Sequence, residues 1–213
     1  MARLTVIIPA RNEAETLRDA IWAIRSRMAY DVYILVVDDH STDQTGYQAR
    51  IASADTVIAN ERAPGYGNAI SLGIRATTTP RLTIMTADGS DDTNALPRYA
   101  AMEDLVFGKR TLPPEYPQAK RVLNRVGNRL IAAQRRVEYD DWTDPFKAYP
   151  TTLAQSCLPL VNNMSAGLEL ALKASQQRPY QVVPVQWRGR EDGQSKFRWR
   201  EPFLYLQTAW RWA

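Results

Sequence analysis

Short apolar runs alternate with amphipathic helical segments through the first half of this chain, and that alternation restricts the fold more than any other feature. Four runs have the length and the β-rich composition of buried strands, namely residues 4–9, 32–37, 56–59 and 82–85. Between the first two runs, apolar residues recur at helical spacing from Leu17 to Met28, and Asn12 with Glu15 fits a capping box at the start of that helix. The pattern predicts an α/β fold built on a mainly parallel sheet.

Polar side chains follow three of these predicted strands at the point where each strand ends. Asp38 and Asp39 come directly after the second run, Asp88 follows the fourth, and the polar segment 11–13 follows the first. In an open α/β sheet, ligands bind at the carboxyl ends of the strands. The sequence therefore predicts a nucleotide-binding cleft at this edge of the sheet.

The second half of the chain has a less regular pattern and contains no repeat or linker. We expect helices at about residues 120–134 and 165–175, a strand at residues 181–187 and a final aromatic helix from about Glu201. These segments favour a single domain over residues 1–213.

The composition excludes several kinds of site. With one cysteine, Cys157, the chain cannot form an internal disulfide, which suits a reducing cytosol. With one histidine, His40, it lacks the ligands of a zinc site, so a bound metal would be a hard cation held by oxygen. The net charge of +4 favours anionic partners and leaves a nucleotide, a lipid phosphate and nucleic acid open. The sequence has neither a signal peptide nor an apolar stretch that could span a membrane, so we expect a cytoplasmic protein.

Several short segments occur in a recognisable order along the chain. The first four are VIIPARNE (6–13), VVDDHSTDQT (36–45), GYGNAISLGI (65–74) and TADGSDD (86–92), and FGKR (107–110), DWTDPFKAY (141–149) and RGREDGQSKF (188–197) follow. Together they cover nearly the whole chain and resemble family-2 glycosyltransferases, in particular the catalytic domains of dolichyl-phosphate mannose synthases and their polyprenyl-phosphate relatives. The resemblance implies a GT-A fold, an inverting mechanism and Mg²⁺ or Mn²⁺ as cofactor. It also implies that residues 1–92 form a nucleotide-sugar-binding half and residues 93–213 an acceptor-side half.

The first two segments supply candidate nucleotide-binding residues. Residues 9–13 end a predicted strand and open a predicted helix, so their backbone N–H groups and Arg11 are placed to face an anionic or polar ligand, while Glu13 is placed to accept from a base. The candidates in this segment are Pro9, Ala10, Arg11 and Glu13. Asp38 and Asp39 are placed to accept from the base or the ribose, although a capped turn would use the same residue types.

The third segment is glycine-rich. Gly65 and Gly67 permit a close approach of the backbone to a ligand, and Arg62 supplies a charge nearby. The resemblance implies that this loop lies under the nucleotide, with Asn68 opening the following helix.

The fourth segment departs from the family pattern, which normally has Asp-x-Asp where this chain has Thr86, Ala87 and Asp88. The first carboxylate is therefore missing. By resemblance, Asp88 binds the metal that bridges the sugar-nucleotide diphosphate, Ala87 lies beside the nucleotide, and Ser90 or Asp91 adds an oxygen donor. One protein carboxylate with substrate phosphates and waters is sufficient for Mg²⁺. Weakened metal binding and a loss of activity both remain open.

The segment DWTDPFKAY matches the family pattern D-x-T-S-G-F-K-x-Y and places Asp141 where the acceptor-side carboxylate lies. Asp144 and Pro145 replace the usual serine and glycine, and proline stiffens this loop. With a hydroxyl acceptor Asp141 would be the general base, whereas an anionic phosphate acceptor needs positioning more than deprotonation.

Cationic side chains follow the metal segment and recur near the end of the chain. Guanidinium groups suit bidentate binding of phosphate, although a single arginine is as readily a solvated surface charge. The candidates for holding the acceptor phosphate and the leaving diphosphate are Arg110, Arg121, Arg125, Arg190 and Lys196.

These observations predict a hexosyltransferase that moves a sugar, with inversion, from a UDP- or GDP-sugar to a polyprenyl phosphate of the dolichyl type at the cytosolic face of a membrane. One alternative is the same chemistry on a glycan, a protein or a modified base of nucleic acid, and another is a non-catalytic nucleotide-binding module. Phe203, Leu206 and Trp210 fall on one face of the last predicted helix, which would rest in a membrane interface or pack on the core. The sugar, the acceptor and the oligomeric state are not determined by the sequence.

Overall fold

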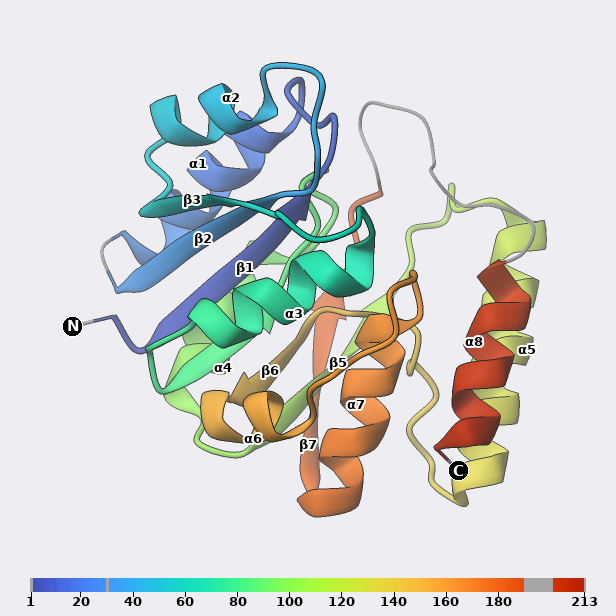
Figure 1. Ribbon diagram of the computed structural model, residues 1–213. Helices are drawn as coiled ribbons and strands as arrows, with labels where there is room; N and C mark the ends of the chain where they lie inside the picture. Colours follow the sequence, from blue (N-terminus) through green and yellow to red (C-terminus); the bar gives the residue numbers. More distant parts are fainter. Residues whose placement is uncertain (1, 30, 190–200, 213) are drawn as a thin grey trace.

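The computed structural model describes residues 2–29, 31–189 and 201–212, and its centre is one seven-stranded sheet (Figure 1). The strands are β1 (Leu4–Ala10), β2 (Val32–Asp38), β3 (Thr56–Ala59), β4 (Arg81–Ile84), β5 (Leu105–Thr111), β6 (Lys147–Pro150) and β7 (Tyr180–Gln186). Their order in the sheet is β3-β2-β1-β4-β6-β5-β7. Only β6 is antiparallel to its neighbours among these described strands, which confirms the predicted α/β fold with a mainly parallel sheet.

Helices cover both faces of this sheet. They are α1 (Leu17–Met28), α2 (Thr45–Ile51), α3 (Tyr66–Ala76), α4 (Leu96–Ala101), α5 (Gln118–Arg135), α6 (Thr151–Ser156), α7 (Ala166–Gln177) and α8 (Glu201–Arg211), with a short 3₁₀ helix at Thr93–Ala95. Because side chains alternate along a strand, Val6 and Ile8 of β1 pack in the core under α1, whereas Ile7 packs in the core under α3 and α7. Figure 1 shows α5 and α8 lying side by side at the edge of the molecule.

The predicted strands and helices are largely present, but α1 begins later than predicted, and the short helices α4 and α6 and two strands were not predicted. The helix α1 begins at Leu17 instead of Asn12, because Asn12 has a left-handed φ of 52° and four further loop residues separate it from the helix. The strands β5 and β6 were not predicted. The sequence of β5 ends in the charged run Lys109–Arg110, and β6 is four residues long and ends in Pro150, so neither has the alternating pattern of an independent strand.

The strand order brings the predicted site residues to one edge of the sheet. Strands β2, β1 and β4 are adjacent and parallel, so their carboxyl ends at Asp38, Ala10 and Ile84 lie along the same edge. The loops that follow these three strands contain the predicted nucleotide and metal residues, which agrees with the general position of ligands in open α/β sheets.

Candidate functional site

The loop after β1 is bound to the loop after β2. Three backbone N–H groups of the first loop donate to side chains of the second: Asn12 N to Ser41 Oγ at 3.0 Å, Glu13 N to Thr45 Oγ1 at 2.9 Å and Ala14 N to Asp43 Oδ2 at 3.2 Å. The prediction that this segment opens a helix is therefore wrong, and the N–H groups of Asn12 and Glu13 donate within the chain. Pro9 and Ala10 belong to β1 itself, and Arg11 and Glu13 lie in the loop at the carboxyl edge.

The two adjacent aspartates after β2 have different surroundings. Asp38 is partly buried, and its Oδ1 accepts from Ser41 N at 3.0 Å. The buried carboxylate of Asp39 accepts from Gly65 N at 2.9 Å and from Asn60 Nδ2 at 2.7 Å. Asp39 thus fixes the loop between β3 and α3, whereas Asp38 lies closer to solvent at the strand end.

The glycine-rich loop is held from its other side by residues that are distant in sequence. A Cβ added at Gly67 would lie 1.8 Å from the carbonyl oxygen of Val161, and one at Gly65 would lie 2.3 Å from Asn162 Oδ1. Asn162 Oδ1 also accepts from Asn68 N at 2.9 Å. Val161 and Asn162 occupy the space that a Cβ would need, so the packing of the chain itself requires glycine at both positions, and a contact with a ligand stays a prediction.

Two further candidates border the same loop. Asn68 lies in the first turn of α3 and donates from Nδ2 to Ala63 O at 2.8 Å. Arg62 is exposed, and its backbone carbonyl lies 2.7 Å from His40 Nε2. The exposed guanidinium of Arg62 is therefore carried by a loop that Asp39 and Asn162 hold in place. No local signal in the sequence pointed to Asn162, because it lies 94 residues from Asn68.

The loop after β4 gathers hydroxyl and carboxylate oxygens. Asp88 Oδ1 accepts from Thr86 Oγ1 and from Ser90 Oγ, each at 2.7 Å. Asp91 Oδ2 accepts from Thr86 N at 2.6 Å and from Thr86 Oγ1 at 2.9 Å. The carboxylate of Asp91 thus binds Thr86, the residue that stands where the family pattern has its first aspartate. Ala87 is buried between these groups.

The environment of Asp91 disfavours the ionised form of its carboxyl group. Its side chain is buried, and burial, followed by the negative charge of Asp144, raises its pKa to about 7, although hydrogen bonds from Thr86 oppose the shift. The negative charge of Asp88 raises it further. The influence of Asp144 on Asp91 shows that the loop after β4 lies close to the loop that contains Asp144.

Asp141 and Arg110 form a buried ion pair. Asp141 Oδ1 accepts from Arg110 Nη2 at 2.6 Å and its Oδ2 from Arg110 N at 2.8 Å, so the pair is bound through side chain and backbone. Burial acts to raise the pKa of Asp141, but the charge and the hydrogen bonds of Arg110 outweigh it and lower this pKa. Arg110 was predicted as a phosphate ligand; the structure places its guanidinium on Asp141.

Two further charged groups lie behind this pair. Asp144 is 1% exposed, with Oδ2 at 3.7 Å from Arg110 Nε, and burial raises its pKa. Lys147 is fully buried, donates to the carbonyl oxygens of Asp141, Trp142 and Asp144, and has its pKa lowered to about 8 by burial. The loop from Asp141 to Lys147 therefore lies among charges of both signs, which compensate one another.

A polar cavity of about 170 Å³ opens beside Arg110 between β5 and α5. Its cations are Lys109, Arg110, Arg121 and Arg125, and its carboxylates are Asp140 and Asp141. Lys109 pairs with Asp140 at 2.8 Å and Arg110 pairs with Asp141, whereas Arg121 and Arg125 have no carboxylate partner among the described residues. Arg190 and Lys196 lie outside the described residues.

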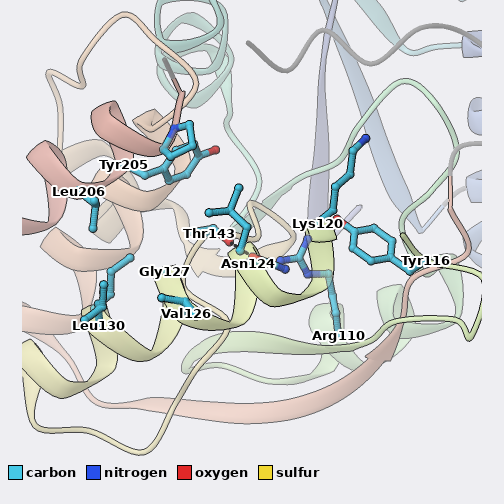
Figure 2. Close-up of a pocket in the computed structure, with 13 residues that line it drawn as sticks. Arg110, Tyr116, Lys120, Asn124, Val126, Gly127, Leu130, Thr143, Tyr205 and Leu206 are labelled. Carbon is cyan, nitrogen blue, oxygen red and sulfur yellow. Dashed lines mark hydrogen bonds between the residues drawn. The ribbon is translucent and has the colours of Figure 1, made fainter. Parts of the chain in front are cut away.

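A second cavity of about 330 Å³ adjoins the first and shares Arg110 and Asn124 with it. Figure 2 shows Val126, Gly127 and Leu130 of α5 facing Tyr205 and Leu206 of α8, with Lys120 and Arg110 toward the other end. Most of its lining is apolar, so it differs in character from the charged cavity.

The fold and the polar carboxyl edge define a GT-A-like protein of the nucleotide-binding α/β class. Residues 5–106 match Glycosyl transferase family 2. Uncharacterized glycosyltransferases of Mycobacterium tuberculosis and Mycobacterium bovis are 40% identical over 111 residues, which is 50% of this chain and 48% of each relative. Residues 5–106, slightly under half of the chain, therefore have the sequence of a family-2 glycosyltransferase domain. The chain spans about half the length of the curated relatives that it matches.

Solved structures agree with this assignment at the level of the fold. Glucosyl-3-phosphoglycerate synthase from Mycobacterium tuberculosis, in a complex with Mn²⁺, UDP and glucosyl-3-phosphoglycerate, has a TM-score of 0.79 at 19% identity and covers 97% of this chain and 78% of that chain. Its complex with phosphoglyceric acid has a TM-score of 0.80 at 19% identity, with coverages of 99% and 79%. The GT-A fold implied by the motifs is thereby confirmed.

Proposed function

We propose that this chain is a glycosyltransferase that moves a sugar from a UDP-sugar to an acceptor carrying a phosphate or carboxylate group. The observation that carries the proposal is the convergence of Asp38, Asp88 and the loop 11–13 at the carboxyl edge of β2, β1 and β4. The family match covers these elements, and the synthase with the same fold was crystallised with UDP and with UDP-glucose. This support favours UDP over the GDP alternative.

The donor site has the chemistry for a divalent cation. Asp88 with the hydroxyls of Thr86 and Ser90 offers the hard oxygen donors that Mg²⁺ and Mn²⁺ prefer, and Asp91 adds a second carboxylate beside them. Structures of the synthase contain Mn²⁺ or Mg²⁺ together with UDP. A bound cation would neutralise charge on the departing diphosphate. Asp88 and Ser90 would hold it, and Arg11 and Arg62 would add positive charge near the nucleotide.

The acceptor site would be the charged cavity between β5 and α5. Arg121 and Arg125 leave two positive charges there without carboxylate partners among the described residues, and this excess suits a phosphate or carboxylate. The synthase was crystallised with phosphoglyceric acid, which is such an acceptor and is not a lipid. We therefore favour a non-lipid acceptor over the polyprenyl phosphate that the motifs implied.

Asp141 would act mainly by positioning. Its carboxylate is committed to Arg110, and its lowered pKa makes it a weak base. An anionic acceptor oxygen needs no base, so the pair would orient Arg110 toward the acceptor. If the acceptor reacts through a hydroxyl, Asp141 remains the carboxylate on the acceptor side, with Arg110 stabilising its charge.

The first test is a thermal-shift and transfer assay. UDP and GDP are compared with and without Mn²⁺, because a ligand bound by the native state alone raises the melting temperature. Transfer from UDP-sugars is then measured to phosphoglycerate, to a short prenyl phosphate and to a neutral oligosaccharide, and the anomeric configuration of the product is read by NMR. Transfer to the neutral sugar alone would contradict the anionic acceptor, and transfer to prenyl phosphate alone would restore the lipid assignment.

A second candidate is a nucleotide-binding module without activity, which Thr86 in place of an aspartate favours. Metal-dependent UDP binding without hydrolysis or transfer for any donor would support that alternative. Loss of both binding and turnover in Asp88→Ala, with folding intact, supports the enzyme.

A further inference from the structure

The large apolar side chains of α5 and α8 are unusually exposed. On α5, Val122, Leu123, Val126 and Leu130 are 57%, 51%, 50% and 55% exposed. On α8, Phe203 and Trp210 are 67% and 76% exposed, the highest values for large apolar side chains among the described residues. We call these six residues the α5–α8 surface.

The six residues lie on two neighbouring helices. Leu123, Val126 and Leu130 recur at helical spacing along one side of α5, and Phe203 and Trp210 lie two turns apart on α8. The helices contact each other, and the apolar cavity between them is lined by the same three α5 residues together with Leu206 (Figure 2). The six exposed side chains therefore lie on two helices in contact with each other, and this concentration of exposed apolar residues suits an interaction surface.

The two helices themselves carry mainly positive charge. From Tyr116 to Val137 the chain has no acidic residue and six basic ones, and Lys120, Arg125 and Arg129 are exposed. The only acidic residue of α8 is Glu201, which is buried, and Arg211 is exposed near the end of the helix. The partner of this surface must accept apolar side chains and compensate positive charge at once.

We propose that the α5–α8 surface docks on an anionic lipid bilayer. Aromatic and aliphatic side chains flanked by Lys and Arg are the composition of helices that lie in a membrane interface. A second copy of this chain would bring two positive surfaces together, which opposes a symmetric dimer. A nucleic acid would neutralise the arginines but would leave the aliphatic side chains of α5 in water. The described helices include none that is long and apolar enough to cross a membrane, so docking would be peripheral.

Docking of this kind would place the charged cavity near the lipid surface. The reason is that α5 carries part of the docking surface and also lines the charged cavity. The proposal does not depend on the identity of the acceptor. A soluble acceptor and a lipid-borne acceptor would each reach a cavity at that position, and the binding test below requires no turnover.

The test is co-sedimentation with vesicles of phosphatidylcholine, with and without about one third phosphatidylglycerol. The double variant Phe203→Ser/Trp210→Ser should lower partitioning onto the anionic vesicles at least about tenfold, because it removes the two most exposed anchors. Arg129→Gln should lower it about fivefold, since each basic residue near an anionic surface adds roughly that factor. Trp22→Ser is the matched control, because Trp22 is 52% exposed on α1, and it should leave partitioning unchanged.

Three outcomes would overturn the proposal: absence of binding, equal binding to neutral vesicles, and an equal loss in the Trp22→Ser control. A dimer in sedimentation velocity that dissociates in Phe203→Ser/Trp210→Ser would also overturn it and would identify a second copy as the occupant. All variants change exposed positions outside the donor site, so each should retain the thermal shift with UDP. Loss of vesicle binding with that shift retained separates this proposal from the proposed function.

Discussion

Gly67→Ala tests whether the glycine-rich loop is held by the chain itself or left open for a ligand. The new methyl carbon would lie 1.8 Å from Val161 O, against about 3.5 Å for a normal contact, so the two segments must separate by roughly 1.7 Å. Forced overpacking costs about 1–3 kcal/mol. The separation also breaks the hydrogen bond from Asn68 N to Asn162 Oδ1, which contributes about 1 kcal/mol.

We expect a total loss of about 3 kcal/mol, which lowers the melting temperature by about 6–12 °C in a domain of this size. Calorimetry and urea unfolding measure the loss, and titration with UDP measures the accompanying weakening of nucleotide binding. Gly127→Ala is the control, because a Cβ there has no neighbour within 4 Å, and alanine in a helix should stabilise by about 0.5–1 kcal/mol. A Gly67→Ala protein that melts within about 1 °C of the wild type would refute the packing of Val161 against this loop.

Three further predictions concern the charged groups. Asp88→Ala should reduce metal-dependent transfer by at least about a hundredfold with little change in the melting temperature, and wild-type activity in this variant would exclude Asp88 as a ligand. Arg110→Met should cost about 3–5 kcal/mol, because Asp141 and Asp144 remain buried without their cation; a near-neutral result in urea unfolding would contradict the ion pair. Lys147 has a pKa of about 8 in the native state and 10.5 when unfolded, so the unfolded chain binds more protons between these values and stability should rise with pH there. Lys147→Met should remove that rise, and an identical slope in both proteins would show that Lys147 does not titrate in this window.

The strands at the carboxyl edge could be predicted from the sequence because each is a short apolar run followed within four residues by polar side chains. Asp38 and Asp88 were found for the same reason. The pair β5 and β6 could not be predicted, because β5 carries lysine and arginine at its functional end and β6 has four residues. Local pattern is a weak guide where a strand is short and its partner is remote in sequence.

The roles of Gly67 and Arg110 could not be predicted either, for a different reason. A glycine is required wherever anything approaches the backbone closely, and the sequence cannot tell a ligand from another loop. In this chain the approaching atoms belong to Val161 and Asn162. In the same way, an arginine suited to phosphate is equally suited to a buried carboxylate, and Arg110 pairs with Asp141 31 residues away.

The replacement of the first metal-motif aspartate by Thr86 is less disruptive in three dimensions than in the sequence. The Asp91 carboxylate binds the backbone and the hydroxyl of Thr86, so a second carboxylate lies beside Asp88 although none precedes it in the motif. Burial and the negative charge of Asp144 both oppose ionisation of Asp91, so a carboxylate at this position costs free energy. A loop without a ligand would gain nothing that offsets this cost. The proposed cation site therefore has two neighbouring carboxylates, Asp88 and Asp91, in spite of the threonine in the motif.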